Sequence, residues 1–347
     1  MPGKTYTVPV PNNMGIVRYV LALAVVIDHF NLLTDSSVPF PVSSYQGVGG
    51  FFALSGFLIY GSYLRKDSAV QYFYARARRI LPAYWMTVLL CALGLSLAST
   101  LGARDYFTSA HFWRYLGANM SFLNFLEPKL PGVFADSVLP SADASLWTMK
   151  VEWCLYATPP LVVWLLRRTR LRGPVVFAAI YVLACAYRAL LLWLYERTGS
   201  EIYSILGRQF LGQLSYFYVG VLWCRFLPAL LRHKAVTGLA CLAAMIAADY
   251  IPAYGLWLEP AVMGTAVVWV SMVGRWGTWE GRRDNVSYNI YLLHWPVIQL
   301  LVQYGACTLP SAASLAIALV ATAALSLLMN AAEHALRARL PRSLPPR

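Results

Sequence analysis

Long runs of apolar residues, separated by short polar segments, make up most of the chain. Each run approaches the roughly 20 residues that an α-helix needs to cross a membrane. Ten runs can be distinguished, at residues 16–33, 47–64, 82–103, 145–166, 174–195, 205–226, 235–251, 260–273, 286–304 and 312–332. The pattern predicts an all-α, polytopic integral membrane protein with about ten transmembrane helices. The seventh and eighth runs are the weakest, so nine or eleven helices stay open.

The composition supports this prediction. The 347 residues are 59% hydrophobic and only 12% charged, whereas a soluble domain has about 25% charged residues. Too few polar groups are present to cover a water-facing surface, which excludes a soluble enzyme, a disordered protein and a disulfide scaffold. The six cysteines are scattered and form no CxxC pair, so neither a metal site nor a disulfide framework is expected.

The distribution of basic residues explains the net charge of +13. With ten helices, 20 Lys and Arg residues fall on one side, four on the other and four within helices. Because basic loops accumulate on the cytoplasmic side, both termini are expected there, and no nucleic-acid partner is expected. No cleaved signal peptide is expected. We expect a cytoplasmic segment at 1–15, one transmembrane domain at 16–332 with an outer loop at 104–144, and a basic cytoplasmic tail at 333–347.

Ionisable side chains inside the first predicted helix are candidates for function, since burying them in lipid is costly. Arg18 and His29 are 11 residues apart, which places them about 20° from one helix face and roughly 16 Å apart along the axis. Such a face suits a ligand with a phosphate head and a reactive end, such as a coenzyme A thioester. Alternatively, Arg18 reaches the lipid headgroups and His29 bonds a neighbouring helix. Asp28 lies about 100° from His29 and is less suited to orienting its ring.

Two further ionisable residues are expected at a similar depth. Glu152 lies about 10 Å into the fourth predicted helix, and His294 lies near the middle of the ninth. A carboxylate that orients a histidine is the usual arrangement of a general base, so His29, Glu152 and His294 could converge. The alternatives are an ion pair of Glu152 with Lys150 or an arginine, and a helix–helix hydrogen bond of His294.

Two segments could contact the phosphate end of such a ligand. GVGGFFALSGFLIYG, at 47–61, contains Ser55 among small residues that allow close approach of a helix or ligand. The basic run YARARRILPAYW, at 74–85, follows on the cytoplasmic side, with Pro82 predicted to begin the third helix. Arg76, Arg78 and Arg79 would either determine orientation or bind phosphates beside Arg18.

Taken together, the segments resemble the membrane acyltransferase type 3 family, which includes bacterial O-acetyltransferases of surface sugars. The resemblance rests on the Arg18–His29 spacing and, in order, on FFALSGFLI at 51–59, RARRILPAYW at 76–85, NMSFLNF at 119–125, SLWTMKVEWCLY at 145–156 and SYNIYLLHWPVI at 287–298. The segments extend over nearly the whole chain. The chain resembles the stand-alone form of the family, which has no appended soluble domain.

The resemblance implies transfer of an acyl group, usually acetyl, from acyl coenzyme A to a hydroxyl of an exported carbohydrate or lipid-linked glycan. It implies that His29 is the essential histidine, with Arg18 as its motif partner, and Glu152 falls in the family's glutamate-bearing segment. Asp28 and His294 stay catalytic candidates because of their positions within predicted helices. Arg18, Ser55 and the three arginines of the basic run are the candidates for binding acetyl-CoA. The expected setting is the bacterial inner membrane, in contact with lipid and without a metal ion.

Several readings stay open. The acyl group could pass directly to a hydroxyl activated by His29, or through a transient acyl-enzyme. The acceptor could instead be a macrolide or another small metabolite. A secondary transporter is a further alternative, although the internal repeat typical of such transporters is not evident. The sequence does not indicate an oligomeric state.

Overall fold

The computed structural model describes residues 12–66, 68–274 and 286–339, and in these residues it contains helices and no strand. The longer helices are α1 (Met14–Thr34), α2 (Ser44–Leu64), α3 (Ala69–Gly94), α6 (Trp147–Arg168), α7 (Gly173–Thr198), α9 (Phe210–Arg232), α13 (Val286–Gln303) and α14 (Ser311–Arg339). The shorter helices are α4 (Ala103–Thr108), α5 (Ala110–Met120), α8 (Glu201–Gly207), α10 (Lys234–Ile246), α11 (Tyr254–Trp257) and α12 (Glu259–Met272). The prediction of an all-α chain is confirmed for this part.

Six helical segments in the described ranges are long and apolar enough to cross a membrane. They are α1, α2, α7, α14, the segment Ala69–Ala98 that begins with α3, and the segment Glu201–Arg232 that contains α8 and α9. The other four predicted spans coincide with α6, α10, α12 and α13. α10 and α12 are short, with 13 and 14 residues, and α6 contains Lys150 and Glu152. The number of ten transmembrane helices and the cytoplasmic placement of both termini stay predictions.

The start of the third helix was predicted wrongly. α3 begins at Ala69, and Pro82 lies inside it rather than at its first turn. Proline removes one backbone donor and bends a helix, but it does not have to end it when the flanking residues favour helix. The run from Gln71 to Arg79 has no glycine or further proline. Arg76, Arg78 and Arg79 therefore project from a helix and not from a loop.

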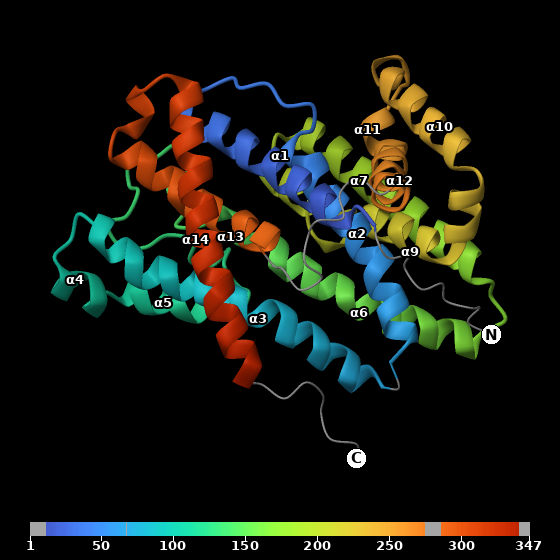
Figure 1. Ribbon diagram of the computed structural model, residues 1–347, viewed down its shortest axis with the longest axis horizontal. Coiled ribbons are helices and arrows are strands. Elements are labelled where there is room, and N and C mark those ends of the chain that lie inside the picture. Colours follow the sequence, from blue (N-terminus) through green and yellow to red (C-terminus); the bar gives the residue numbers. More distant parts are fainter. Residues whose placement is uncertain (1–11, 67, 275–285, 340–347) are drawn as a thin grey trace. The chain divides into compact units, whose positions relative to one another are not determined.

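The chain divides into two compact units. Unit 1 consists of Met1–Leu21, Tyr45–Tyr72 and Val151–Glu280, and unit 2 consists of Ala22–Ser44, Phe73–Lys150 and Gly281–Arg347. In unit 1, α9 packs against α7 and α12, and α10 and α11 pack against α12. In unit 2, α13 and α14 form an antiparallel hairpin, and α4 packs against α5 (Figure 1).

Glycine brings α2 and α9 into backbone contact in unit 1. A Cβ atom at Gly56 would lie 1.9 Å from the carbonyl oxygen of Phe217, and one at Gly220 would lie 1.9 Å from that of Ala53. Neither oxygen can move without moving its helix. Small residues are the usual means of close helix packing in membranes, where lipid is as apolar as leucine. The small residues of the 47–61 segment thus have a packing role.

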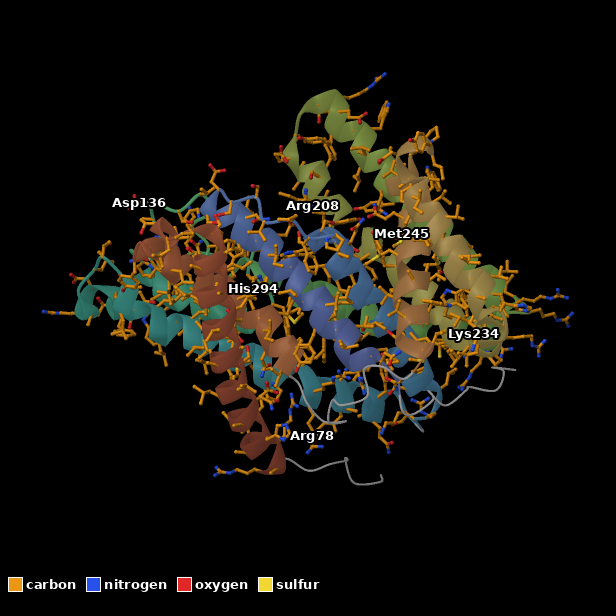
Figure 2. All side chains as sticks on the ribbon, turned by 45° about the horizontal axis from the view of Figure 1, so that its top comes forward. Arg78, Asp136, Arg208, Lys234, Met245 and His294 are labelled. Atoms are coloured by element: carbon orange, nitrogen blue, oxygen red, sulfur yellow. The ribbon has the colours of Figure 1, made fainter. Side chains whose placement is uncertain are left out.

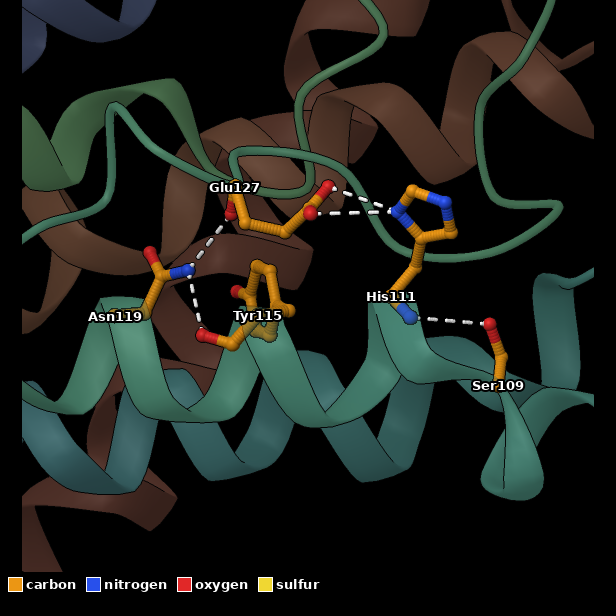
Figure 3. Close-up of polar contacts among 5 residues, drawn as sticks. All are labelled: Ser109, His111, Tyr115, Asn119 and Glu127. Atoms are coloured by element: carbon orange, nitrogen blue, oxygen red, sulfur yellow. Dashed lines mark hydrogen bonds and ion pairs between the residues drawn. The ribbon is translucent and has the colours of Figure 1, made fainter.

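The outer loop predicted at 104–144 contains α4, α5 and an irregular stretch. At the start of α5, the Ser109 side chain accepts a hydrogen bond from the backbone N–H of His111 (Figure 3). His111 Nδ1 lies 3.3 Å from both carboxylate oxygens of Glu127. Asn119 donates its amide to the carbonyl oxygens of Tyr115 and Glu127, at 2.9 and 3.0 Å. These contacts hold the irregular stretch against α5.

The contact between Gly220 and α2 predicts that one added methyl group strongly lowers the stability of the protein. Gly220→Ala should lower the free energy of unfolding by about 2 kcal/mol or more, because the added Cβ forces α2 and α9 apart. The measurement is the midpoint of thermal unfolding of the purified protein in detergent. Gly117→Ala in α5 is the matched control, since nothing lies within 4 Å of its Cβ position. Equal midpoints for the two variants would contradict the close packing.

Candidate active site

His29 lies near the end of α1 and contacts a second histidine. Its Nδ1 is 2.7 Å from Nε2 of His294, which is fully buried on α13. The two rings are nearly parallel, with centroids 5.0 Å apart and an angle of 12°. Both residues belong to unit 2, where Figure 2 labels His294. The structure therefore brings together two of the predicted catalytic residues.

The hydrogen-bond partners of His294 assign the protons of both rings. His294 Nδ1 is 2.7 Å from the carbonyl oxygen of Tyr291, which can only accept, so Nδ1 carries the proton. In the neutral ring, Nε2 of His294 is then an acceptor, and Nδ1 of His29 must donate to it. The remaining nitrogen, Nε2 of His29, has a free lone pair. This arrangement leaves His29 ready to accept a proton from a substrate.

Apolar side chains surround the histidine pair. Trp295 lies edge-on to the His29 ring, with centroids 5.0 Å apart and an angle of 86°. It belongs to a buried cluster of α1, α13 and α14 that consists of Val26, Phe30, Leu33, Trp295, Ile298 and Ala318. Because this packing restricts the indole and the helix faces beside it, it limits the orientations that His29 can adopt.

Polar side chains of α13 hold the outer loop. Trp295 Nε1 donates to the carbonyl oxygen of Ser141 at 3.0 Å, and Gln299 Nε2 donates to that of Leu139 at 2.7 Å. Ser137 Oγ donates to Gln299 Oε1 at 2.7 Å. Trp295 and Gln299 are four residues apart and share a helix face. The segment 137–141 is thus bound along the helix that carries His294.

Asp28, another predicted catalytic residue, makes a contact away from the His29 ring. One of its carboxylate oxygens accepts a hydrogen bond from the backbone N–H of Ser44, at 2.9 Å. Ser44 is the first residue of α2, where free N–H groups favour a carboxylate. The carboxylate of Asp28 therefore joins the end of α1 to the start of α2, while the ring of His29 is oriented by His294.

Glu152 and the predicted donor residues Arg18 and Ser55 lie in unit 1. Glu152, on α6, accepts a short hydrogen bond from the Tyr156 hydroxyl one turn later. Arg18 and Ser55 are both half-buried, on α1 and α2.

The basic run of α3 contacts the end of α14 in unit 2 (Figure 2). Arg78 Nη2 donates to the carbonyl oxygen of Arg337, and Arg337 Nη2 donates to that of Arg79, each at 2.8 Å. Arg337 also pairs with the fully buried carboxylate of Glu333. These reciprocal contacts link the basic run of α3 to the end of α14 and fix the side chain of Arg78. α14 continues to Arg339, so the first part of the predicted tail is helical.

Asp143 is a buried carboxyl that the sequence did not single out. It precedes α6, and its Oδ1 accepts hydrogen bonds from the backbone N–H and the hydroxyl of Ser145, at 2.9 and 2.7 Å. Its Oδ2 is buried without a partner. Burial raises the pKa of Asp143 to about 7, although the hydrogen bonds from Ser145 oppose this shift. An acidic residue in a cap position is the only sequence signal for it.

The comparisons with known proteins identify the class. A family model for acyltransferase domains matches residues 12–331, so the chain belongs to this acyltransferase family. The chain is similar to "Nodulation protein 10" of Rhizobium leguminosarum bv. viciae, with 26% identity over 85% of this chain and 84% of the relative. It is also similar to an "O-acetyl transferase" of Shigella phage Sf6, with 27% identity over 42% of this chain and 44% of the relative. No solved structure matches the chain significantly.

The buried carboxyl predicts a dependence of stability on pH. Because the pKa of Asp143 is higher in the folded state than its usual value of 3.8, the folded protein binds the extra proton. Stability should therefore fall as the pH rises from about 4 to about 7 and then level off. Asp143→Asn, which resembles the protonated form, should be more stable than the parent at pH 8, by on the order of 2 kcal/mol, with a smaller difference at pH 5.

Unfolding midpoints at the two pH values test this. Asp136→Asn is the control, because Asp136 is an exposed residue of the same loop (Figure 2). A constant difference between Asp143→Asn and the parent at both pH values would show that Asp143 is ionised in the folded protein.

Proposed function

We propose that this acyltransferase transfers an acetyl group from acetyl-CoA to a hydroxyl of a cell-surface or exported carbohydrate. The observation that supports the proposal most directly is the His29–His294 pair, which leaves Nε2 of His29 as a base. Membership of an acyltransferase family supports the acyl chemistry, and the relative named as an O-acetyl transferase supports acetyl and a hydroxyl acceptor. A multi-pass position in the bacterial inner membrane, with ten spans and cytoplasmic termini, is part of the proposal.

In the proposed reaction, Nε2 of His29 removes the proton of the acceptor hydroxyl as its oxygen attacks the thioester carbonyl carbon. The charge on the imidazolium is stabilised by the bond from His29 Nδ1–H to His294 Nε2. When the tetrahedral intermediate collapses, the carbon–sulfur bond breaks, and the coenzyme A thiolate takes the proton back from His29. Donor, acceptor and protons balance, and both histidines return to their starting tautomers.

Direct transfer agrees better than an acyl-enzyme relay with the observed pair. In a relay on His29, Nε2 would have to form the acyl bond itself and could not act as the base in the same step. The proposal therefore has one chemical step, with donor and acceptor bound together.

Arg18 in unit 1 and Arg76, Arg78 and Arg79 in unit 2 are each proposed, from their chemistry, as contacts for the phosphates of the donor. Guanidinium groups pair well with phosphate, and coenzyme A has three phosphate groups. Ser55, on α2, is a further candidate for donor binding, and Glu152, on α6, is a further candidate for catalysis. On the α1 helix, Arg18 and His29 are separated by three turns, which suits the length of the pantetheine arm.

The histidine pair predicts distinct effects of two substitutions. His29→Ala should reduce acetyl transfer to background, because the base is removed. His294→Phe should keep the apolar volume but remove the acceptor that orients His29, and should lower kcat by about 10² to 10⁴-fold with little change in KM for acetyl-CoA. The measurement is transfer of labelled acetyl from acetyl-CoA to methyl glycosides by purified protein in nanodiscs.

The control is His233→Ala, which removes an exposed histidine of unit 1. It should leave kcat unchanged, because this imidazole is not part of the pair. A normal kcat for His294→Phe would exclude the proposed role of the pair, while a normal rate for His29→Ala would exclude the chemistry altogether.

The role of Arg18 can be tested with a donor that lacks phosphate. Arg18→Ala should raise KM for acetyl-CoA about tenfold or more and leave KM for S-acetylpantetheine unchanged, because only the former carries the phosphates. Steady-state kinetics with both donors provide the measurement. An equal rise in KM for both donors would indicate a structural role for Arg18 instead.

A further inference from the structure

Unit 1 contains a second group of buried polar side chains, which the sequence analysis did not assign to any role. We call it the Arg188 cluster, and it consists of Tyr45 on α2, Arg188 on α7, Gln213 and Tyr216 on α9, and Glu259 at the start of α12. Arginine is rarely buried in a membrane helix unless it has a function. Yet Arg188 is only 9% exposed, Gln213 1% and Tyr216 0%.

The members of the cluster lie close together. Arg188 Nη2 donates to the carbonyl oxygen of Gly255 at 2.9 Å. Its guanidinium carbon is 5.6 Å from the ring centroid of Tyr45 and 6.0 Å from that of Tyr216. The two rings are 6.0 Å apart and nearly perpendicular, at 78°. The Tyr45 side chain also lies beside Gln213 and within electrostatic range of Glu259.

The chain folds so as to create this arrangement. A Cβ atom at Gly49 would lie 2.5 Å from the Tyr216 ring, so the absence of a side chain there lets the ring lie against α2. Gln213 Nε2 donates to the carbonyl oxygen of Arg208 at 3.2 Å, which fixes the orientation of the amide. Gln46 Nε2 donates to Glu259 Oε1 at 2.9 Å, which connects the carboxylate to the start of α2.

Three buried polar atoms of the cluster match a hydroxylated ligand. Tyr45 makes side-chain contacts with Gln213 and Tyr216, but no hydrogen bond of good geometry satisfies these three atoms. They are Arg188 Nη1, Gln213 Oε1 and the Tyr216 hydroxyl oxygen. The first can only donate, the second can only accept, and the third can do both. Burying such groups without partners is costly, so their presence indicates a ligand that supplies the missing bonds.

The charges of the cluster select among ligands. The positive charge of Arg188 is accompanied by the negative charge of Glu259, and both act on the Tyr45 hydroxyl. A phosphate or carboxylate would be repelled by Glu259 and would find no donor in Gln213 Oε1. A sugar hydroxyl both donates and accepts, and sugar rings also pack on aromatic faces such as that of the half-buried Tyr45.

We propose that the Arg188 cluster is a binding site for an uncharged sugar of the acceptor. Sugar hydroxyls accept from Arg188 Nη1, donate to Gln213 Oε1 and exchange a hydrogen bond with the Tyr216 hydroxyl. Tyr45 and Glu259 are half-buried, so this side of the cluster lies nearest the surface of unit 1. The inference rests on the proposed function in one respect, namely that the bound sugar is part of the molecule that is acetylated.

The test is equilibrium binding and not catalysis. Saturation-transfer difference NMR with the full-length protein in nanodiscs measures binding of methyl glycosides of glucose, galactose, mannose, rhamnose and N-acetylglucosamine. At least one should bind. Tyr216→Phe, which removes one oxygen atom, should weaken its binding about fivefold, and Gln213→Leu should weaken it tenfold or more. Tyr218→Phe is the matched control, because Tyr218 lies about 200° around α9 from Tyr216 and should leave binding unchanged.

The possible outcomes separate the inference from the proposed function. His29→Ala should bind the glycoside normally while transferring no acetyl group. Absence of glycoside binding, unchanged binding in Tyr216→Phe, or displacement of the glycoside by inorganic phosphate at similar concentration would overturn the site. If acetyl transfer occurred without glycoside binding to the cluster, the proposed function would stand and the site would not. If the glycoside bound to the cluster but no acetyl group was transferred, the site would stand and the proposed function would not.

Discussion

The hydrogen bond between His29 and His294 is the constraint on which the chemistry depends. The fully buried imidazole of His294 has two nitrogens to satisfy, and neither can rely on water. A backbone carbonyl that can only accept fixes one ring, that ring fixes the other, and the base nitrogen of His29 is what remains. A carboxylate is the more usual partner of a catalytic histidine. Here a neutral imidazole fulfils the orienting role without bringing a second charge into the protein.

The surrounding structure can be understood from the need to keep this pair in place. Apolar residues of α1, α13 and α14 pack around it, and Trp295 both contacts His29 and binds the outer loop. The same principle applies in unit 1, where Gly56 and Gly220 allow α2 and α9 to touch along their backbones. Close backbone packing leaves little freedom for the polar side chains between helices, which preserves the geometry of the Arg188 cluster.

Much of the fold was predictable because lipid imposes a simple pattern on the sequence. The long apolar runs predicted α1, α2 and α7 nearly to their ends and most of α14, and the first run correctly placed Arg18 and His29 on one helix. Helices that mix charged with apolar residues were harder to predict. Pro82 was taken as a helix start because proline favours that position, but the residues before it continue the helix. Segment 145–166 was predicted as a span, yet α6 contains charged residues that keep it outside the apolar set.

The members of the site and the meeting of His29 with His294 were predictable, but the atoms that pair were not. His29 and His294 were selected as intramembrane ionisable residues, whereas the partner of each depends on contacts over 265 positions of sequence. Asp28 was adjacent in sequence, but the helix directs it to Ser44. Arg188 was visible as a charge inside a predicted span, and no sequence feature connected it with Gln213 or Glu259. Such clusters arise from several helices and become apparent only when the chain is folded.

The most direct measurement of the central claim is the tautomeric state of the two histidines. Nitrogen NMR of protein labelled with ¹⁵N-histidine, with signals assigned through His29→Ala and His294→Ala, reports which nitrogen of each ring carries a proton. The account predicts that both rings are neutral and that Nδ1 is protonated in each, with Nε2 of His29 free. A proton on Nε2 of His29 in the resting protein would contradict the account, because the nitrogen proposed as the base would then be unable to accept one.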